Sequence, residues 1–533
     1  MTPPQVVVVG NGPVGQTAAL LLGRWGVRTL VLDRRPSRDV AGSRAICQHR
    51  DVLDVWATVG AGEQIAQEGV TWTTARTFHR DRELFSYPLP EAGRSPFPPF
   101  VNISQARTEE VLDERIANEA LVEVRWGCEV VGIEQDTRGA AVRCADGTVV
   151  RAPYVLVCAG ARADTLRAGL EVTFEGRSFD DRFLICDIRA DLAGWAAERR
   201  FWFDPAWNPG RQVLIHPCPG STFRIDWQVP PDYDLDADER SGGLDARIRA
   251  IIGEQPYEIV WRSVYRFQSR IASRLQVGRV LLAGDAAHLF SPFGARGLNS
   301  GVQDAENAAW KLAFVLRGWA PQALLGSYHD ERHAAARENL AVTTATMDFL
   351  VPPDPERAAH RRSVLERAVD DPAVHPHVDS GRLAEPFWYV DSPLTTRDDL
   401  RRRFAGRPPR GAVPDPGPGI LLPDAPVRHP RVTRLRELAR DGFLLLVTDP
   451  LSPMVLENLT VAAPVRARRL ADLDPDGEIA ALLRARPGEV WIVRPDAHVA
   501  AVLSHPRPGA VDAAVHRALG ARATRPDVVG SSA

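Results

Sequence analysis

The sequence predicts an α/β protein in which parallel strands are separated by long antiparallel insertions. A short β-α-β pattern with a glycine-rich turn opens the chain at residues 5–32. Alternating strands at 122–150 precede a buried strand at 154–158, and antiparallel strands at 171–274 precede another buried strand at 280–283. Regular βαβ repeats would lack such insertions, so two interleaved layers are expected.

The composition is that of an ordinary globular protein and limits the classes of function. The 533 residues carry 65 Lys and Arg against 68 Asp and Glu, a net charge of −3. This near-neutral balance argues against a nucleic-acid-binding protein, and no apolar stretch is long enough for a membrane helix. Six scattered cysteines without a CxxC pair predict reduced thiols in a cytoplasmic protein with no metal site.

The N-terminal pattern is a dinucleotide-binding fingerprint. Residues 5–9 form a β-branched strand, 16–25 suit a helix, and a second strand at 29–32 ends at Asp33. The turn between them is Gly10-Asn11-Gly12-Pro13-Val14-Gly15. Its glycines permit a tight turn and close approach of a pyrophosphate, the helix start offers N–H groups, and the acid binds a ribose hydroxyl.

The insertions favour FAD over NAD as the dinucleotide. After Asp33 we expect a helix at 45–59, a region rich in Pro and Arg at 87–100, and a helix at 108–118. Long insertions between parallel strands are typical of a two-domain flavoprotein.

A second cluster follows the strand at 280–283. That strand delivers Asp285 to the carboxyl end of the sheet, where ligands bind in open α/β sheets. A helix starting near Gly297 would direct its positive dipole end at an electron-rich ring. Lys311, the single lysine, lies within this helix, where a side chain that extends to the surface or forms a salt bridge is the default.

With these residues the chain resembles the class A flavoprotein monooxygenases, of which para-hydroxybenzoate hydroxylase is the type, in the branch of phenol, hydroxyphenylpropionate and polyketide hydroxylases. The resemblance implies a Rossmann-like FAD-binding core of the GR2 type, an interleaved antiparallel-sheet substrate domain and a C-terminal thioredoxin-like domain without CxxC. The implied boundaries are 1–170 and 276–400 for the FAD-binding and helical parts, 171–275 for the substrate domain, and 401–533 for a linker (Pro- and Arg-rich at 408–426) and the C-terminal domain.

The resemblance also implies a set of FAD-binding residues. They are Gly10, Gly12, Pro13, Val14, Gly15, Asp33, Arg34, Arg44, Gln105, Gly160, Gly284, Asp285, Pro292, Gly297, Leu298 and Asn299. One motif departs from the family pattern, because Gly160-Ala161 stands where an Asp-Gly pair is expected and Asp164 stands for a serine. Arg167 alone matches that motif, so the handling of the nicotinamide cofactor is open.

The middle segment is rich in aromatic residues, which suits a planar phenolic ligand. In the family the substrate lies between this sheet and the flavin. The candidates for holding it are Trp202, His216, Arg224, Gln228 and Tyr265. The candidates for a catalytic role are Pro292, Tyr265 and His216.

The implied function is hydroxylation of a phenolic or polycyclic aromatic substrate by O2 through a flavin C4a-hydroperoxide, with NADPH or NADH as electron donor. One alternative is a flavin oxygenase of the same fold that performs Baeyer–Villiger, ring-expanding or dearomatising chemistry, with a separate flavin reductase as a possible partner. The other is a catalytically silent flavin-binding module. A homodimer is a further possibility.

Overall fold

The computed structural model describes residues 3–38, 45–88, 95–398, 414–449, 459–507 and 509–521. The chain divides into two compact units. Unit 1 comprises Met1–Glu91, Pro96–Glu306 and His333–Glu385. Unit 2 comprises Ala92–Ser95, Asn307–Arg332 and Pro386–Ala533.

A six-stranded sheet forms the base of unit 1. Its order is β17-β18-β11-β1-β2-β7, with every pair parallel except β17 and β18. The strands are β1 (Val6–Val9), β2 (Thr29–Leu32), β7 (Val122–Arg125), β11 (Tyr154–Val157), β17 (Gln276–Val277) and β18 (Val280–Leu282). All residues of β1, β2, β11 and β18 are buried, as their continuous apolar sequences predict. The predicted interrupted α/β fold is confirmed.

Helices cover this sheet, and two small sheets border it. Helix α1 (Pro13–Arg24) packs with α4 (Gln105–Ile116), and Gln16 donates a 2.9 Å hydrogen bond to the Glu109 carbonyl. The helix expected at 45–59 is shorter, because β3 (Cys47–His49) pairs with β6 (Phe100–Asn102) before α2 (Arg50–Ala57) begins. Helix α3 (Gly62–Glu68) follows. Strands β8 (Val130–Gln135), β9 (Ala140–Cys144) and β10 (Val149–Ala152) form a meander, which α5 (Asp164–Gly169) contacts.

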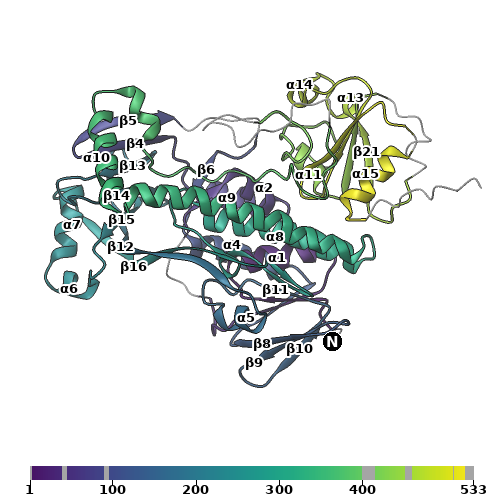
Figure 1. Cartoon of the computed structure of the whole chain (residues 1–533), viewed down its shortest axis with the longest axis horizontal. Coiled ribbons are helices and arrows are strands. Elements are labelled where there is room, and N and C mark those ends of the chain that lie inside the picture. Colours follow the sequence, from purple (N-terminus) through teal and green to yellow (C-terminus); the bar gives the residue numbers. More distant parts are fainter. Residues whose placement is uncertain are drawn as a thin grey trace, which may run out of the picture. The chain divides into compact units, whose positions relative to one another are not determined.

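The second large element of unit 1 is an eight-stranded sheet with the order β19-β16-β12-β15-β14-β13-β4-β5, in which every strand except β19 is labelled in Figure 1. Its strands are β4 (Thr74–His79), β5 (Arg82–Pro88), β12 (Phe174–Ala190), β13 (Glu198–Phe203), β14 (Gln212–Cys218), β15 (Thr222–Val229), β16 (Tyr257–Ala272) and β19 (His288–Leu289). The predicted antiparallel strands at 171–274 form its centre. Helices α6 (Leu235–Arg240) and α7 (Gly243–Ile252) interrupt them and were not predicted.

Two apolar clusters cover opposite faces of this sheet because side chains alternate along each strand. On one face, Leu184, Ile215 and Trp227 pack against Leu244 and Ile248 of α7. On the other face, phenylalanines pack against the end of α9 (Gly326–Leu350) and against α10 (Pro355–Ala368). These are Phe179, Phe183, Phe201, Phe203 and Phe293.

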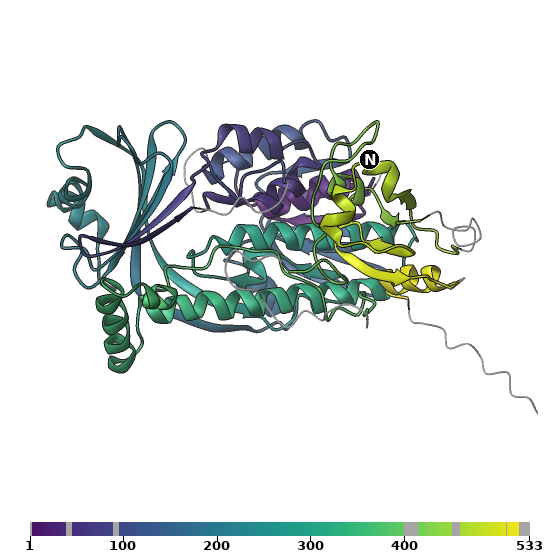
Figure 2. The same ribbon diagram turned by 90° about the horizontal axis from the view of Figure 1, so that it is seen from above.

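Two long helices run side by side in Figures 1 and 2, α8 (Arg296–Leu316) and α9. In unit 1, Arg296 donates a 2.6 Å hydrogen bond to Asn339, which joins the start of α8 to α9. Within the described ranges, no helix combines the length and the apolar character that a bilayer crossing requires.

Unit 2 contains a four-stranded sheet of order β21-β20-β22-β23. Strands β20 (Phe443–Val447) and β21 (Val465–Arg469) are parallel, whereas β22 (Glu489–Val493) and β23 (Val499–Ser504) are antiparallel to their neighbours. A final helix, α15 (Ala510–Ala518), packs on β22 and β23. This topology is that of the expected thioredoxin-like domain, and residues 401–533 contain no cysteine. Part of the expected Pro- and Arg-rich linker at 408–426 belongs to this domain, because Leu421, Leu422 and Ala425 are buried in its core.

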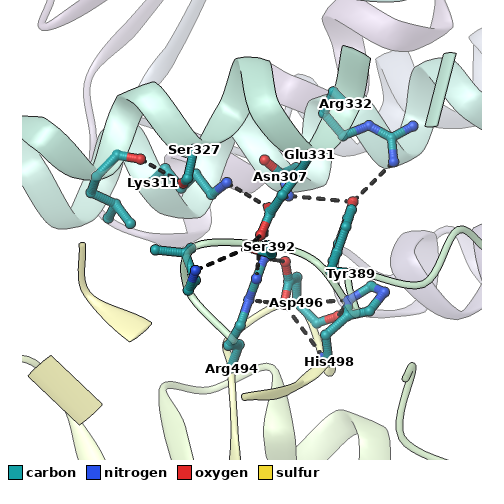
Figure 3. Close-up of polar contacts among 12 residues, drawn as sticks. Asn307, Lys311, Ser327, Glu331, Arg332, Tyr389, Ser392, Arg494, Asp496 and His498 are labelled. Carbon is teal, nitrogen blue, oxygen red and sulfur yellow. Dashed lines mark hydrogen bonds and ion pairs between the residues drawn. The ribbon is translucent and has the colours of Figure 1, made fainter. Parts of the chain in front are cut away.

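A buried charged network lies inside unit 2 (Figure 3). Glu331 accepts hydrogen bonds from both Arg494 nitrogens, at 2.5 and 3.0 Å, and from Lys311 at 2.7 Å. Arg494 also binds Asp496 at 2.5 Å, and Tyr389 accepts a 2.9 Å hydrogen bond from Arg332. Lys311 is therefore ion-paired, as expected for a lysine within a helix, and its side chain is fully buried.

Candidate flavin and substrate site

The glycines of the turn after β1 meet two different structural requirements. A Cβ added to Gly10, whose φ is +105°, would lie 2.4 Å from the Cys158 carbonyl oxygen, and one added to Gly15 would lie 1.9 Å from that of Gly10. A Cβ added to Gly12 would meet no atom of the described residues within 4 Å. Gly10 and Gly15 therefore permit tight packing of the chain on itself, whereas the space beside Gly12 suits an approaching diphosphate.

The start of α1 fits an anion. Pro13 occupies the first helical position, and no side chain of the described residues caps the helix. The free N–H groups of the first turn, near Val14, therefore face the turn itself. Asn11, between the glycines, is fully buried, and neither its Oδ1 nor its Nδ2 has a partner among the described residues. Such atoms suit a polar ligand.

Asp33 lies at the end of β2 and is held as a carboxylate. It accepts hydrogen bonds from the Asn11 backbone N–H at 2.7 Å, from the Arg35 backbone N–H at 2.9 Å and from Arg35 Nε at 3.0 Å. Burial raises its pKa, but the bonds from Arg35 and Asn11 outweigh burial and lower it. Arg34 is exposed, so the arginine that contacts this carboxylate is its neighbour, which the sequence analysis missed. Arg44 lies outside the described residues.

The loops that follow β1, β11 and β18 gather at one edge of the sheet, since these strands are parallel. Gly160 has a φ of +71°, and an added Cβ would meet nothing there. Gly284 and Asp285 form a single 3-10 turn, η1 (Gly284–Ala286), after β18. The turn is fixed by Asp304 of α8, whose Oδ2 accepts the Gly284 N–H at 2.9 Å and contacts Nε2 of His288 at 2.7 Å.

Arg167 joins the altered motif to the η1 turn. Its Nη1 donates to the Ala286 carbonyl at 3.0 Å, and its Nη2 binds Asp164 at 2.6 Å. Asp164, which stands where the family pattern has a serine, thus pairs with Arg167, the one residue that matches the pattern. The side chain of Arg167 is only 3% exposed, so this link is part of the fold at the sheet edge.

The start of α8 is anchored to β3. Asn299 Oδ1 accepts the His49 N–H at 2.8 Å, and its Nδ2 donates to the Cys47 carbonyl at 3.0 Å. An added Cβ on Gly297 would meet nothing within 4 Å. Leu298 is half-buried and Pro292 is exposed in the preceding loop. The helix start therefore presents backbone groups to open space, as a bound flavin ring requires.

Gln105 and two unpredicted residues complete the polar surroundings. Gln105 accepts the Ala45 N–H at 3.2 Å and donates to Glu109 at 2.8 Å. Gln48 of β3 is fully buried, with no partner for either side-chain polar atom among the described residues, and the same holds for Ser291 Oγ. A sequence gives no sign of this, because Gln48 lies in a stretch that resembles a helix.

Four of the five substrate candidates share one face of the eight-stranded sheet. His216 pairs with Arg224 across β14 and β15, Gln228 lies four residues along β15, and Tyr265 pairs with Phe183 of the phenylalanine cluster. Trp202 projects from the opposite face, where it stacks on Phe78 at a ring distance of 4.8 Å and packs against the cluster beside α7.

The polar part of this face contains tightly coupled charges. Arg224 binds Asp187 through two hydrogen bonds of 2.7 and 2.9 Å. Gln228 donates to Asp181. Burial and the nearby arginines Arg199 and Arg224 hold the pKa of His216 well below its usual value, so the imidazole is neutral.

This face adjoins the start of α8. Cys218, at the end of β14, packs in one cluster with Cys47 and with Ala295 of the loop before α8. Phe293 of the same loop contacts Phe183 and Phe267, at ring distances of 5.5 and 6.1 Å. The residues around the glycine-rich turn, the η1 turn and the α8 start thus fit FAD, with the polar sheet face beside its implied ring position. Among the described residues, no group of His, Cys, Asp and Glu side chains could hold a metal ion.

The arrangement defines a flavoprotein with a two-part dinucleotide-binding core. Residues 4–343 match the family model described as FAD binding domain. A 3-(3-hydroxy-phenyl)propionate/3-hydroxycinnamic acid hydroxylase of Mycobacterium sp. (strain JLS) is 31% identical over 71% of this chain and 66% of its own length. The chain belongs to this family of class A FAD-dependent aromatic hydroxylases.

Two further comparisons cover more of the chain. The dialkyldecalin synthase of Streptomyces rugosporus is 31% identical over 81% of this chain and 90% of its own length. The structure of the flavin-dependent monooxygenase PieE in complex with FAD and substrate covers 97% of this chain and 99% of its own, with a TM-score of 0.84 and 24% identity. At 24% identity, this similarity shows that the two proteins share a fold and nothing further. The chain spans slightly less than two thirds of the length of the first hydroxyphenylpropionate hydroxylases.

Proposed function

We propose that the protein is an FAD-dependent monooxygenase that hydroxylates a phenolic or polycyclic aromatic substrate with O2. The observation that carries this proposal is the continuity between two regions. The α8 start is hydrogen-bonded to Cys47, and Cys47 packs with Cys218 at the end of the polar sheet face. A planar ligand on that face would lie beside the flavin ring position.

The protein's own residues supply binding, orientation and exclusion of water. The free N–H groups of α1 and the space at Gly12 would hold the diphosphate, and Asp33 the ribose. Bound FAD would supply the transfer of electrons and the activation of O2. The phenylalanine cluster of Phe183, Phe201 and Phe293 would keep water from the reacting atoms.

His216, Arg224, Gln228 and Tyr265 would orient the substrate from the sheet. Trp202, on the opposite face, would act on the substrate only through the packing of the sheet. Pro292 and the helix start would polarise the flavin, as the resemblance to the family implies.

NADPH or NADH is the proposed electron donor. Gly160 leaves the usual carboxylate position open, and Asp164 instead pairs with Arg167. A separate flavin reductase is the alternative source of electrons. We further propose that the protein acts in the cytoplasm, with homodimerisation as a possible role of the C-terminal domain.

The test begins with the purified protein. It should be yellow, release FAD on denaturation, and consume O2 when supplied with NADPH or NADH and a phenol from a panel. Mass spectrometry should find a product with one added oxygen and an intact ring. A protein that takes up no FAD, or that shows no response to any phenol with either nucleotide or with a flavin reductase, contradicts the proposal.

A second candidate function is a reaction of the same fold that reorganises the ring system. The likeness to a dialkyldecalin synthase over 90% of that protein's length favours keeping it. Products that show ring expansion, cleavage or loss of aromaticity would support this candidate over hydroxylation.

A further inference from the structure

Two buried polar atoms on the substrate face have no partner among the described residues. They are Oδ1 of Asp226 and Nδ1 of His216. Asp226 lies on β15 two residues after Arg224, the cross-strand partner of His216, so the two side chains are diagonal neighbours on one face. An unsatisfied buried polar atom costs about 1–3 kcal/mol. A ligand that bonds to both atoms would remove this cost.

Burial and the surrounding charges shift the pKa of both groups. Burial raises the pKa of Asp226 to about 7, although Arg224 and Arg199 act in the opposite direction and Asp187 reinforces the rise. The neutral imidazole of His216 can donate or accept one hydrogen bond through Nδ1. Near neutral pH, this part of the face therefore holds a carboxyl group that gains or loses a proton easily, beside a neutral partner.

We propose that Asp226 and His216 together bind the hydroxyl group of an uncharged phenolic substrate, and that Asp226 accepts its proton. This inference rests on the proposed function, since it concerns the ring to be hydroxylated. In the step, the phenol O–H bond breaks, its electron pair stays on the phenol oxygen, and the proton bonds to Asp226 Oδ1. A phenolate and a carboxylic acid result, with no change of net charge and no oxidation.

The fixed charges explain why the step is favoured at this place. Arg199 of β13 and Arg224 of β15 lie on the two strands that flank β14, on the same face, and both act on Asp226 and on His216. When the negative charge moves from the carboxylate to the phenol oxygen, it stays within the field of the two guanidinium groups. A phenolate is the more electron-rich form of the ring, which is the form an electrophilic oxygen donor attacks.

The same charges select against a carboxylate-bearing ligand. Arg224 is committed to Asp187 by two hydrogen bonds, and Arg199 donates to the Ser380 carbonyl at 3.0 Å. A ligand carboxylate would place a further negative charge beside Asp187 and Asp226. The substrate class that fits is therefore a phenol without a carboxylate near the hydroxyl group.

The test is a binding cycle on the FAD-loaded enzyme, measured by calorimetry at pH 7.5. The ligands are 4-methylphenol, which stays uncharged at this pH, and its methyl ether, 4-methylanisole, and the proteins are wild type, Asp226→Asn, Asp226→Glu and the exposed control Asp180→Asn. Wild type and control should prefer the phenol about tenfold, which corresponds to about 1.4 kcal/mol. Asp226→Asn should lose this preference while binding the anisole unchanged, and Asp226→Glu should keep part of it.

A second arm tests charge selection and the proton. The enzyme should bind 3-methylphenol at least about tenfold more tightly than 3-hydroxybenzoate, which carries a carboxylate near the hydroxyl group. Oxidation of the nucleotide stimulated by a phenol should rise with pH through about 7 in wild type, as Asp226 ionises, and lose this rise in Asp226→Asn.

The outcomes separate this inference from the proposed function. An unchanged preference in Asp226→Asn, equal binding of the carboxylate, or no binding of either methylphenol by wild type overturns the assignment of the site, even where a hydroxylated product forms. The expected binding cycle without any oxygenated product would instead uphold the site and contradict hydroxylation.

Discussion

Gly12 and Gly15 stand three residues apart in one turn, yet their surroundings impose different demands. The backbone crowds Gly15, because an added Cβ would overlap the Gly10 carbonyl oxygen at 1.9 Å. The space beside Gly12 is open, and its φ of −84° is accessible to any residue. The motif therefore combines Gly10 and Gly15, which the packing of the protein requires, with Gly12, which the ligand requires.

Alanine substitutions should separate these two roles. We expect Gly12→Ala to fold with a melting temperature close to that of wild-type apoprotein but to bind FAD at least about tenfold more weakly, since the methyl group occupies the diphosphate space. Gly15→Ala should lower the stability of the apoprotein itself, by about 1–3 kcal/mol or more, because the turn must move.

Thermal melting of the apoproteins and FAD titration monitored by flavin fluorescence would measure both effects. If Gly12→Ala lost stability as much as Gly15→Ala, the space beside Gly12 would have a structural role instead.

Residue-scale prediction from sequence reaches furthest where local spacing determines the contact, as where the Asn11 N–H of the glycine-rich turn donates to Asp33, although the roles of these residues in FAD binding stay predictions. The turn at 10–15 and Asp33 are local in this sense. Asp226 was missed because a lone carboxylate in an alternating strand has the pattern of a solvent-facing residue; only its register beside Arg224 reveals that it is desolvated. Asp304 was likewise seen only as part of a helix, although it fixes the η1 turn.

At the scale of elements, helices α8 and α9 bring Lys311 and Glu331 to Arg494, which follows β22 (Figure 3). Glu331 is the centre, because it accepts from both cations and from Asn307 at 2.8 Å. Burial opposes its ionisation, but Arg494 and Lys311 hold its pKa well below the usual value. The Glu331 carboxylate is therefore a buried anion that Lys311 and Arg494 both contact.

Substitution of Glu331 and substitution of Lys311 should destabilise the protein by different amounts. Glu331→Gln leaves two buried cations without their shared anion and should destabilise the protein by about 3–5 kcal/mol. Lys311→Met leaves the Glu331–Arg494 pair intact and replaces the ammonium group with an apolar group, so its cost should stay below about 1.5 kcal/mol.

Urea unfolding at pH 7 would measure the two costs. Equal costs would contradict a central role for Glu331.

Lys311 also predicts a dependence of stability on pH. Burial lowers its pKa from 10.5 to about 8, although Glu331 acts to raise it. Between about pH 8 and pH 10 the unfolded chain keeps the proton that the folded protein has released, so stability rises with pH from this residue. The free energy of unfolding of wild type minus that of Lys311→Met should increase over this range.

The difference between the two proteins cancels the tyrosines and cysteines that also titrate there. A difference that stayed constant or fell from pH 8 to pH 10 would show that the lysine stays protonated in the folded state.

At the scale of the whole molecule, the sequence predicted which domains the chain forms better than which residues belong to each compact unit. A C-terminal thioredoxin-like domain was expected, and β20 and β22 belong to a sheet with that topology. The contribution of residues 307–332 to unit 2 was not predicted, because it depends on partners such as Glu331 and Arg494 that are 163 residues apart. Periodicity within a helix reveals an apolar face but gives no information on what covers it.

This division of the chain predicts that the C-terminal part is not a separable appendage. A chain ending at residue 385 would lose Arg494, Tyr389 and Ser392 from around Glu331. It would also uncover Trp310 and Phe314, which pack on Phe443 at ring distances of 6.4 and 6.2 Å. Newly exposed apolar surface of this kind promotes aggregation.

Expression of residues 1–385 alone should therefore give aggregated protein with little bound FAD, whereas co-expression of 386–533 as a second chain should restore soluble, yellow protein containing both pieces. The second chain supplies the buried partners without a covalent link, so recovery would identify packing as the cause of the loss. A soluble 1–385 fragment with the full FAD content and melting temperature of the whole chain would show instead that residues 307–332 need no partner from the C-terminal part.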